Sequence, residues 1–83
     1  MVTKKQITVL GATGSIGQSA LALVRENHRK FSVQALVAGE NYQALAALAN
    51  EFQPKIIGIH DESKYRELSN LVSDLDCDVV AGK

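Results

Sequence analysis

The sequence has few of the residues that mark a specialised class of protein. Its 83 residues include one cysteine, one proline and no tryptophan. The single cysteine, Cys77, excludes an internal disulfide and a cysteine-based metal site, and we expect it to be a small buried thiol in a reducing compartment. Nine basic and nine acidic residues give a formal net charge of +0, which argues against a nucleic-acid partner. The remaining composition, 46% hydrophobic and 22% charged, is that of a globular chain.

The sequence also lacks a long hydrophobic run. Residues 7–10 form the first apolar segment, which is far shorter than the core of a signal peptide or a membrane-spanning helix. We therefore expect a cytoplasmic protein with no membrane partner. A chain of this length hides only about 60% of its unfolded surface, so its core is expected to be thin.

Apolar residues alternate between two spacings along the chain. Short β-compatible runs are separated by segments with helical periodicity and by turn residues. The predicted strands are residues 6–10, 33–38, 56–59 and 77–81, and the predicted helices are residues 15–27, 42–52 and 62–72. The order β-α-β-α-β-α-β predicts an α/β fold with a Rossmann-like parallel sheet. Residues 1–83 are expected to form only part of such a domain.

The pattern also predicts how the elements are capped and buried. Asn41 and Asp61 are expected to cap the second and third helices. The first strand is expected to be buried on both faces, as in a parallel sheet covered by helices on both sides. The predicted apolar faces consist of Ile16, Ala20, Leu21, Leu23 and Val24 in the first helix and of Tyr65, Leu68, Leu71 and Val72 in the third.

A glycine-rich segment, Gly-Ala-Thr-Gly-Ser-Ile-Gly, joins the first predicted strand to the first predicted helix. Gly11 allows a sharp turn, Gly14 allows backbone N–H groups to approach an anion, and Gly17 allows the helix to pack closely. The helix N-terminus adds free donors and about half a positive charge. This context favours dinucleotide binding over a ligand-free tight turn. No Gly-Lys-Ser/Thr follows, which excludes a Walker-type phosphate loop.

The segment differs from the standard dinucleotide fingerprint in two ways. Its spacing is Gly-x-x-Gly-x-x-Gly, which lengthens the loop and adds the hydroxyls of Thr13 and Ser15. The second predicted strand also ends without the acid that holds the ribose of NAD, and the nearest acid, Glu40, comes after Gly39. The missing acid favours NADP and Glu40 favours NAD, so the residues alone leave the choice open.

These residues resemble the family of 1-deoxy-D-xylulose 5-phosphate reductoisomerase. The similarity begins with Ile-Thr-Val-Leu-Gly-Ala-Thr-Gly-Ser-Ile-Gly at residues 7–17 and continues through Leu-Val-Arg at 23–25 and Phe-Ser-Val at 31–33. It then includes Ala-Leu-Val-Ala-Gly at 35–39, Asn41 and Glu-Phe-Gln-Pro at 51–54. The resemblance covers nearly the whole chain, and the combined motifs are far more specific than the glycines alone.

The resemblance implies a parent enzyme of non-mevalonate isoprenoid biosynthesis. That enzyme uses NADPH and Mg²⁺ or Mn²⁺ to rearrange and reduce 1-deoxy-D-xylulose 5-phosphate to 2-C-methyl-D-erythritol 4-phosphate, and is expected to be a homodimer. Family members would contact the cofactor pyrophosphate region with Thr13, Gly14, Ser15 and Ile16, and the adenosine ribose and its 2′-phosphate with Gly39, Glu40 and Asn41. Relatives often carry a basic or small residue at the position of Glu40.

The family enzyme is several times longer, and its metal ligands, substrate site and flap lie downstream. The resemblance therefore implies that this chain is an inactive N-terminal fragment without catalytic or metal-binding residues. Two alternatives stay open: the cofactor half-domain of an epimerase or semialdehyde dehydrogenase, and a non-catalytic nucleotide-sensing module. The histidines His28 and His60 and the acids of residues 74–78 lack the spacing of a metal site.

Overall fold

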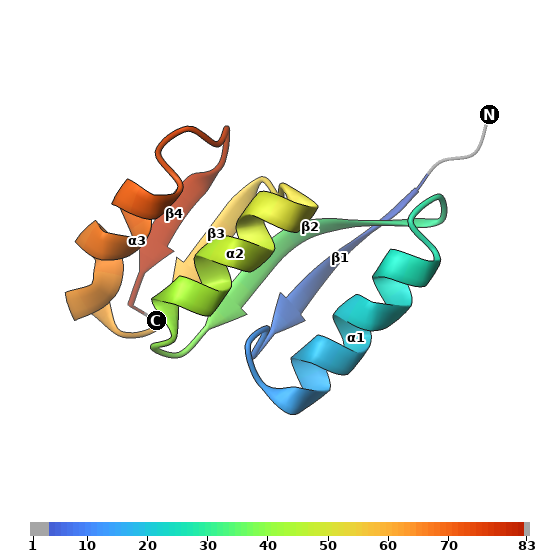
Figure 1. The fold of residues 1–83 in the computed structure, drawn as a ribbon, viewed down its shortest axis with the longest axis horizontal. Coiled ribbons are helices and arrows are strands. Elements are labelled where there is room, and N and C mark those ends of the chain that lie inside the picture. Colours follow the sequence, from blue (N-terminus) through green and yellow to red (C-terminus); the bar gives the residue numbers. More distant parts are fainter. Residues whose placement is uncertain (1–3, 83) are drawn as a thin grey trace.

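A computed structural model describes residues 4–82, which form a parallel sheet with helices on one face (Figure 1). Residues 1–3 and residue 83 lie outside the described part of the chain. The expectation of a cytoplasmic N-terminal segment depends in part on residues 1–3. The strands are β1 (Lys5–Leu10), β2 (Phe31–Ala38), β3 (Ile56–Ile59) and β4 (Asp78–Ala81). The helices are α1 (Ser15–Glu26), α2 (Tyr42–Phe52), the 3₁₀ helix η1 (Glu62–Lys64) and α3 (Tyr65–Leu71). The predicted α/β order of elements is therefore confirmed.

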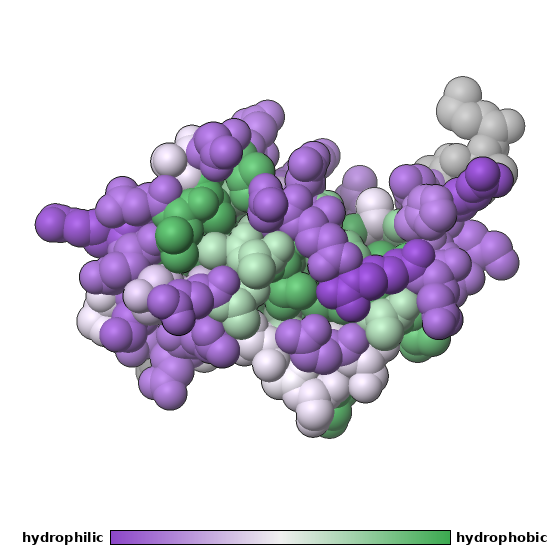
Figure 2. Space-filling model, viewed as in Figure 1, coloured by the Kyte–Doolittle hydropathy of each residue, from purple (hydrophilic) through white to green (hydrophobic). Residues whose placement is uncertain are grey.

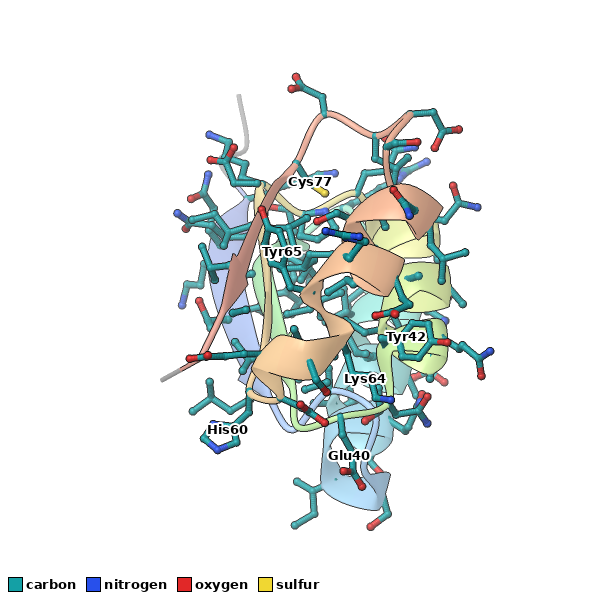
Figure 3. The ribbon with its side chains drawn as sticks, turned by 90° about the vertical axis from the view of Figure 1, so that its left-hand side faces the viewer. Glu40, Tyr42, His60, Lys64, Tyr65 and Cys77 are labelled. Carbon is teal, nitrogen blue, oxygen red and sulfur yellow. The ribbon has the colours of Figure 1, made fainter. Side chains whose placement is uncertain are left out.

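The strands are hydrogen-bonded in the order β1-β2-β3-β4, and every pair is parallel. The register shifts between Ile7 and Thr8, where Gln34 of β2 has no partner in β1. Each connection leads to the next strand in the same direction along the sheet. Right-handed crossovers therefore place all helices on the same face. Figures 1 and 3 show this arrangement, with one face of the sheet facing the helices and the other free of them.

The single helical layer explains why the burial predicted for the first strand is wrong. Val9 faces the helices and is buried, whereas Leu10 faces the opposite side and is 73% exposed. A strand with helices on one face only cannot bury both of its side-chain rows. Ile56 and Val80 are exposed for the same reason, since they belong to neighbouring strands of this sheet.

The hydrophobic core lies between the sheet and the helices. It contains the central side chains of β2 and β3 together with the inner faces of α1, α2 and α3, and no polar or charged residue is buried in the described chain. Its fully buried large side chains are Leu21, Leu36, Leu45, Ile57, Ile59, Leu68 and Pro54. Figure 2 shows that the helical side of the molecule is largely hydrophilic, with hydrophobic surface in bands among the helices.

Two predicted helix faces need correction. In α1 the core side consists of Gly17, Leu21 and Val24, while Ile16 and Leu23 are exposed. The predicted helix over residues 62–72 is divided into η1 and α3. Leu68 and Val72 of its predicted apolar face are buried, whereas Tyr65 and Leu71 are exposed. Each helix packs against the sheet on one side only. The sheet therefore covers just part of a wide apolar stripe, and the rest of the stripe stays exposed.

The expected caps of the later helices are confirmed. The Asn41 side chain accepts a hydrogen bond from the Ala44 N–H at 3.1 Å. Asp61 caps η1 by accepting from the Ser63 N–H at 3.0 Å. Within the described residues no helix is long and apolar enough to span a membrane.

Candidate functional site

The glycine turn between β1 and α1 has the tight geometry that its sequence predicts. Gly11 adopts a φ of +61°, in the left-handed region that glycine occupies without strain. The Gly14 N–H donates to the Gly11 carbonyl at 2.9 Å and closes the turn. A Cβ added to Gly17 would stand 2.2 Å from the Gly11 carbonyl oxygen. The absence of a side chain at Gly17 therefore lets α1 start directly against the turn.

The N-terminus of α1 keeps its backbone donors free of side-chain caps. Gly14 is the N-cap residue and supplies no side chain, and no acidic residue lies in the first turn. Gly14, Ser15 and Ile16 are exposed, and Thr13 is half-buried. An uncapped N-terminus of a three-turn helix offers N–H groups and a positive dipole end to an anion. The chemistry of residues 13–16 is therefore suited to an anion.

The second predicted segment, Gly39 to Asn41, lies beside this turn. Leu10 and Val37 are partners in the β1–β2 register, and the Ala12 N–H donates to the Val37 carbonyl at 2.8 Å. The two turns therefore leave neighbouring strands at the same edge of the sheet. Gly39 and Glu40 are exposed there, whereas the Asn41 side-chain oxygen is occupied by the cap of α2. The amide nitrogen of Asn41 is the group that remains to donate to a ligand.

A pocket of about 690 Å³ continues from Gly39 and Glu40 toward β3 and β4. Its other lining residues are His60, Asp61, Glu62, Ser63 and Gly82. Hydrogen bonds fix this edge: the Asp61 N–H donates to the Gly39 carbonyl at 2.9 Å, and the Gly82 N–H donates to the Ile59 carbonyl at 3.0 Å. Figure 3 shows Glu40 and His60 at the end of the molecule where the strands end.

The sequence pattern does not place the residues after β3 at this edge. It predicts Asp61 only as a helix cap and assigns His60 no ligand role. The signal that could have found them is topological, because in an open parallel sheet the loops after successive strands line the same ligand-binding edge.

The pocket is electrostatically acidic. Glu40, Asp61 and Glu62 line it, and no lysine or arginine does so within the described residues. The pKa of Asp61 is lowered, first by the hydrogen bond from the Ser63 hydroxyl and then by that from the Ser63 N–H. Asp61 is therefore a carboxylate at neutral pH. The Lys64 ammonium lies 5.8 Å from the centre of the Tyr42 ring, in the adjacent helical layer.

The described part of the chain offers no comparable centre elsewhere. Cys77 is half-buried rather than fully buried, and partial burial, together with Asp78 and Asp76, raises the pKa of its thiol. Within residues 4–82 no group of three or more His, Cys, Asp and Glu side chains is placed to hold a metal ion. Arg25 pairs with Glu51 across α1 and α2, at the opposite end of the helices from the glycine turn.

Comparison with known proteins gives one family. The family model of 1-deoxy-D-xylulose 5-phosphate reductoisomerase matches residues 7–83. The enzyme of that name from Desulfitobacterium hafniense strain Y51 is 49% identical over 78 residues, which are 94% of this chain and 20% of the relative. The enzyme from Microcystis aeruginosa is 42% identical over 81 residues. The chain thus spans about one-fifth of the length of the curated relatives it matches.

Solved structures of the same enzyme have the same fold over this region. The structure from Zymomonas mobilis in complex with NADPH aligns with a TM-score of 0.92 and 38% identity, over 96% of this chain and 21% of that one. A DOX-P reductoisomerase in complex with NADPH, fosmidomycin and magnesium aligns with a TM-score of 0.90 and 37% identity, over 95% of this chain and 20% of that one.

Proposed function

Because this chain belongs to the 1-deoxy-D-xylulose 5-phosphate reductoisomerase family, we propose that residues 1–83 are the N-terminal part of a domain that binds NADPH. The observation that carries the proposal is the uncapped N-terminus of α1 behind the Gly11–Gly14 turn. It provides an anion site at the edge of the sheet where dinucleotides bind in this class of fold. The similarity to a reductoisomerase in complex with NADPH supports it.

We propose that residues 13–16 hold the pyrophosphate. The Gly14 N–H is used by the Gly11 carbonyl, so the N–H groups of Ser15 and Ile16 and the positive end of α1 attract the anion. The hydroxyls of Thr13 and Ser15 add donors. Gly14 has a φ of −85° and a ψ of 176°, an extended backbone conformation that residues with a side chain also adopt without strain. Its role is to leave space for the ligand. Ile16, which is 87% exposed, would flank the bound cofactor.

We propose that Gly39, Glu40 and Asn41 surround the adenosine ribose and its 2′-phosphate. The exposed Gly39 leaves room for the sugar, and the free amide nitrogen of Asn41 is a donor for a phosphate oxygen. Glu40 opposes this role because its carboxylate repels a phosphate at short range. The preference for NADP(H) over NAD(H) is therefore expected to be weakened by Glu40, and a cation at this position should strengthen it.

The complete enzyme is proposed to rearrange and reduce 1-deoxy-D-xylulose 5-phosphate as a cytoplasmic homodimer. NADPH supplies the hydride for that reduction, and Mg²⁺ or Mn²⁺ would be held by residues outside this chain. The present chain contributes binding and orientation of the adenosine half of the cofactor. No residue of this chain is assigned a catalytic role.

Replacement of Gly14 tests the proposed function. In Gly14→Val the added Cβ would lie 3.4 Å from the Gly11 carbonyl oxygen, an ordinary contact that the fold accommodates. The branched side chain would nevertheless fill the space in front of the helix donors. We expect NADPH binding, followed by fluorescence titration, to be lost in a folded Gly14→Val variant. The matched control is Ala47→Val, which places a valine at an exposed position of α2. Unchanged NADPH affinity in Gly14→Val would contradict the proposed function.

A further inference from the structure

The pocket beyond Glu40 has the position that an adenine base would occupy. Adjacent parallel strands lie about 4.8 Å apart, so the ends of β3 and β4 are about 10 to 15 Å from the end of β1. A dinucleotide whose pyrophosphate lies at the β1–α1 turn and whose ribose lies at the end of β2 therefore extends toward β3. The lining residues on that side are His60, Asp61, Glu62, Ser63 and Gly82.

Asp61 is the lining residue whose position is most firmly fixed. Its N–H donates to the Gly39 carbonyl at 2.9 Å. Its Oδ1 atom accepts from both the N–H and the hydroxyl of Ser63, at 3.0 Å and 2.6 Å. Within residues 4–82 no hydrogen bond to its second oxygen, Oδ2, is present. Asp61 therefore offers one unused acceptor on a side chain whose rotamer is already set.

We propose that Asp61 selects adenine as the base of the bound dinucleotide by accepting a hydrogen bond from its 6-amino group through Oδ2. This proposal rests on the proposed NADPH-binding function. Adenine presents two N–H donors at position 6, which a carboxylate complements. A 6-oxo purine such as hypoxanthine presents an oxygen there, and its lone pairs face those of the carboxylate. Because Asp61 is fixed by Ser63, it cannot turn away at no cost.

Other pocket carboxylates are less suited to this role. Glu40 lies at the end of β2, where the ribose is proposed to bind. Glu62 lies against the end of β4: a Cβ added to Gly82 would stand 2.6 Å from its Oε1 atom. Neither side chain is held by a hydrogen bond within the described residues, whereas Asp61 is held at two points. Preorganisation therefore singles out Asp61.

The experiment compares NADPH with its hypoxanthine analogue, nicotinamide hypoxanthine dinucleotide phosphate. Both are titrated into the ¹⁵N-labelled 83-residue chain, and the dissociation constants are obtained from amide shifts, which also report whether each variant is folded. The wild-type chain should bind NADPH about tenfold more tightly than the analogue. The key variant is Asp61→Asn. The Ser63 N–H can only donate, so it holds the amide oxygen at the Oδ1 position, and the amide nitrogen replaces Oδ2.

The Asp61→Asn variant should lose the preference for adenine or reverse it, because its amide nitrogen is a donor that complements a 6-oxo group. The matched control is Glu67→Gln, which removes the same charge from an exposed position of α3 outside the pocket and should keep the wild-type ratio. Equal affinity of the wild-type chain for the two dinucleotides would overturn the role of Asp61, even if Asp61→Asn fails to fold. A preference that persists in folded Asp61→Asn would also overturn it. Binding of neither dinucleotide by the wild-type chain would overturn the proposed function itself.

Discussion

Gly17→Ala provides a direct test of the close approach between α1 and the glycine turn. The added Cβ would lie 2.2 Å from the Gly11 carbonyl oxygen and 2.8 Å from the Ala12 Cα. Both atoms belong to the backbone, so no side-chain rotation relieves the overlap, and α1 must move away from the turn by about 1 Å. Overpacking of this kind costs about 3 kcal/mol, and the higher helix propensity of alanine returns about 1 kcal/mol.

We therefore expect Gly17→Ala to lower the free energy of unfolding by about 2 kcal/mol, a change of roughly thirtyfold in the folding equilibrium. Urea denaturation followed by circular dichroism measures this change as a shift of the midpoint at constant slope. The matched control, Ser19→Ala, places the same residue at an exposed position of α1 and should be neutral or slightly stabilising. If Gly17→Ala is as stable as the wild type, the close packing of α1 on the turn is wrong.

Three further predictions concern the proposed site, the acid dependence of stability and the activity of the isolated chain. In the complete enzyme, Glu40→Lys should improve the affinity for NADP(H) relative to NAD(H) by roughly five- to tenfold, because a cation replaces a repelling carboxylate; an unchanged affinity ratio would show that Glu40 points away from the 2′-phosphate. The pKa of Asp61 and that of Glu51 lie below their ordinary values of 3.8 and 4.5, so the stability they contribute is present at neutral pH and is lost as the pH falls below about 4.5; Glu51→Gln should make thermal unfolding less sensitive to acid over that range. The isolated chain should not oxidise NADPH in the presence of 1-deoxy-D-xylulose 5-phosphate and Mg²⁺ or Mn²⁺, and turnover by the pure chain would contradict the assignment of catalysis to residues outside it.

The elements and the turn were predictable because their signals are local. The β-branched run before Gly11 and the change to helical periodicity after Gly14 lie within a few residues of each other, and Asn41 precedes its helix directly. The positive φ of Gly11 and the close approach at Gly17 follow from the same short segment. The glycine turn therefore needed no knowledge of the tertiary fold.

The burial of individual side chains, and the pocket residues that follow β3, depend instead on which strands are neighbours in the sheet. Leu10 looks like a buried strand residue by composition, yet the one-sided sheet leaves it exposed. Ile16 continues a helical apolar pattern, yet it is exposed in the first turn of α1, whose buried residues are Gly17, Leu21 and Val24. The sequence around Asp61 predicts only a helix cap. Asp61 lines the pocket because β3 pairs with β2, which brings the residues after β3 next to Gly39 and Glu40.

The central claim is that this chain binds the adenosine half of NADPH along the edge where the four strands end. The most direct measurement is a map of backbone amide shifts on titration of the ¹⁵N-labelled chain with NADPH. The largest changes should fall on residues 13–16, 39–41 and 60–63, which lie at that edge. Changes confined to the opposite edge, around residues 28–31 and 53–55, or no changes at millimolar NADPH, would contradict the claim.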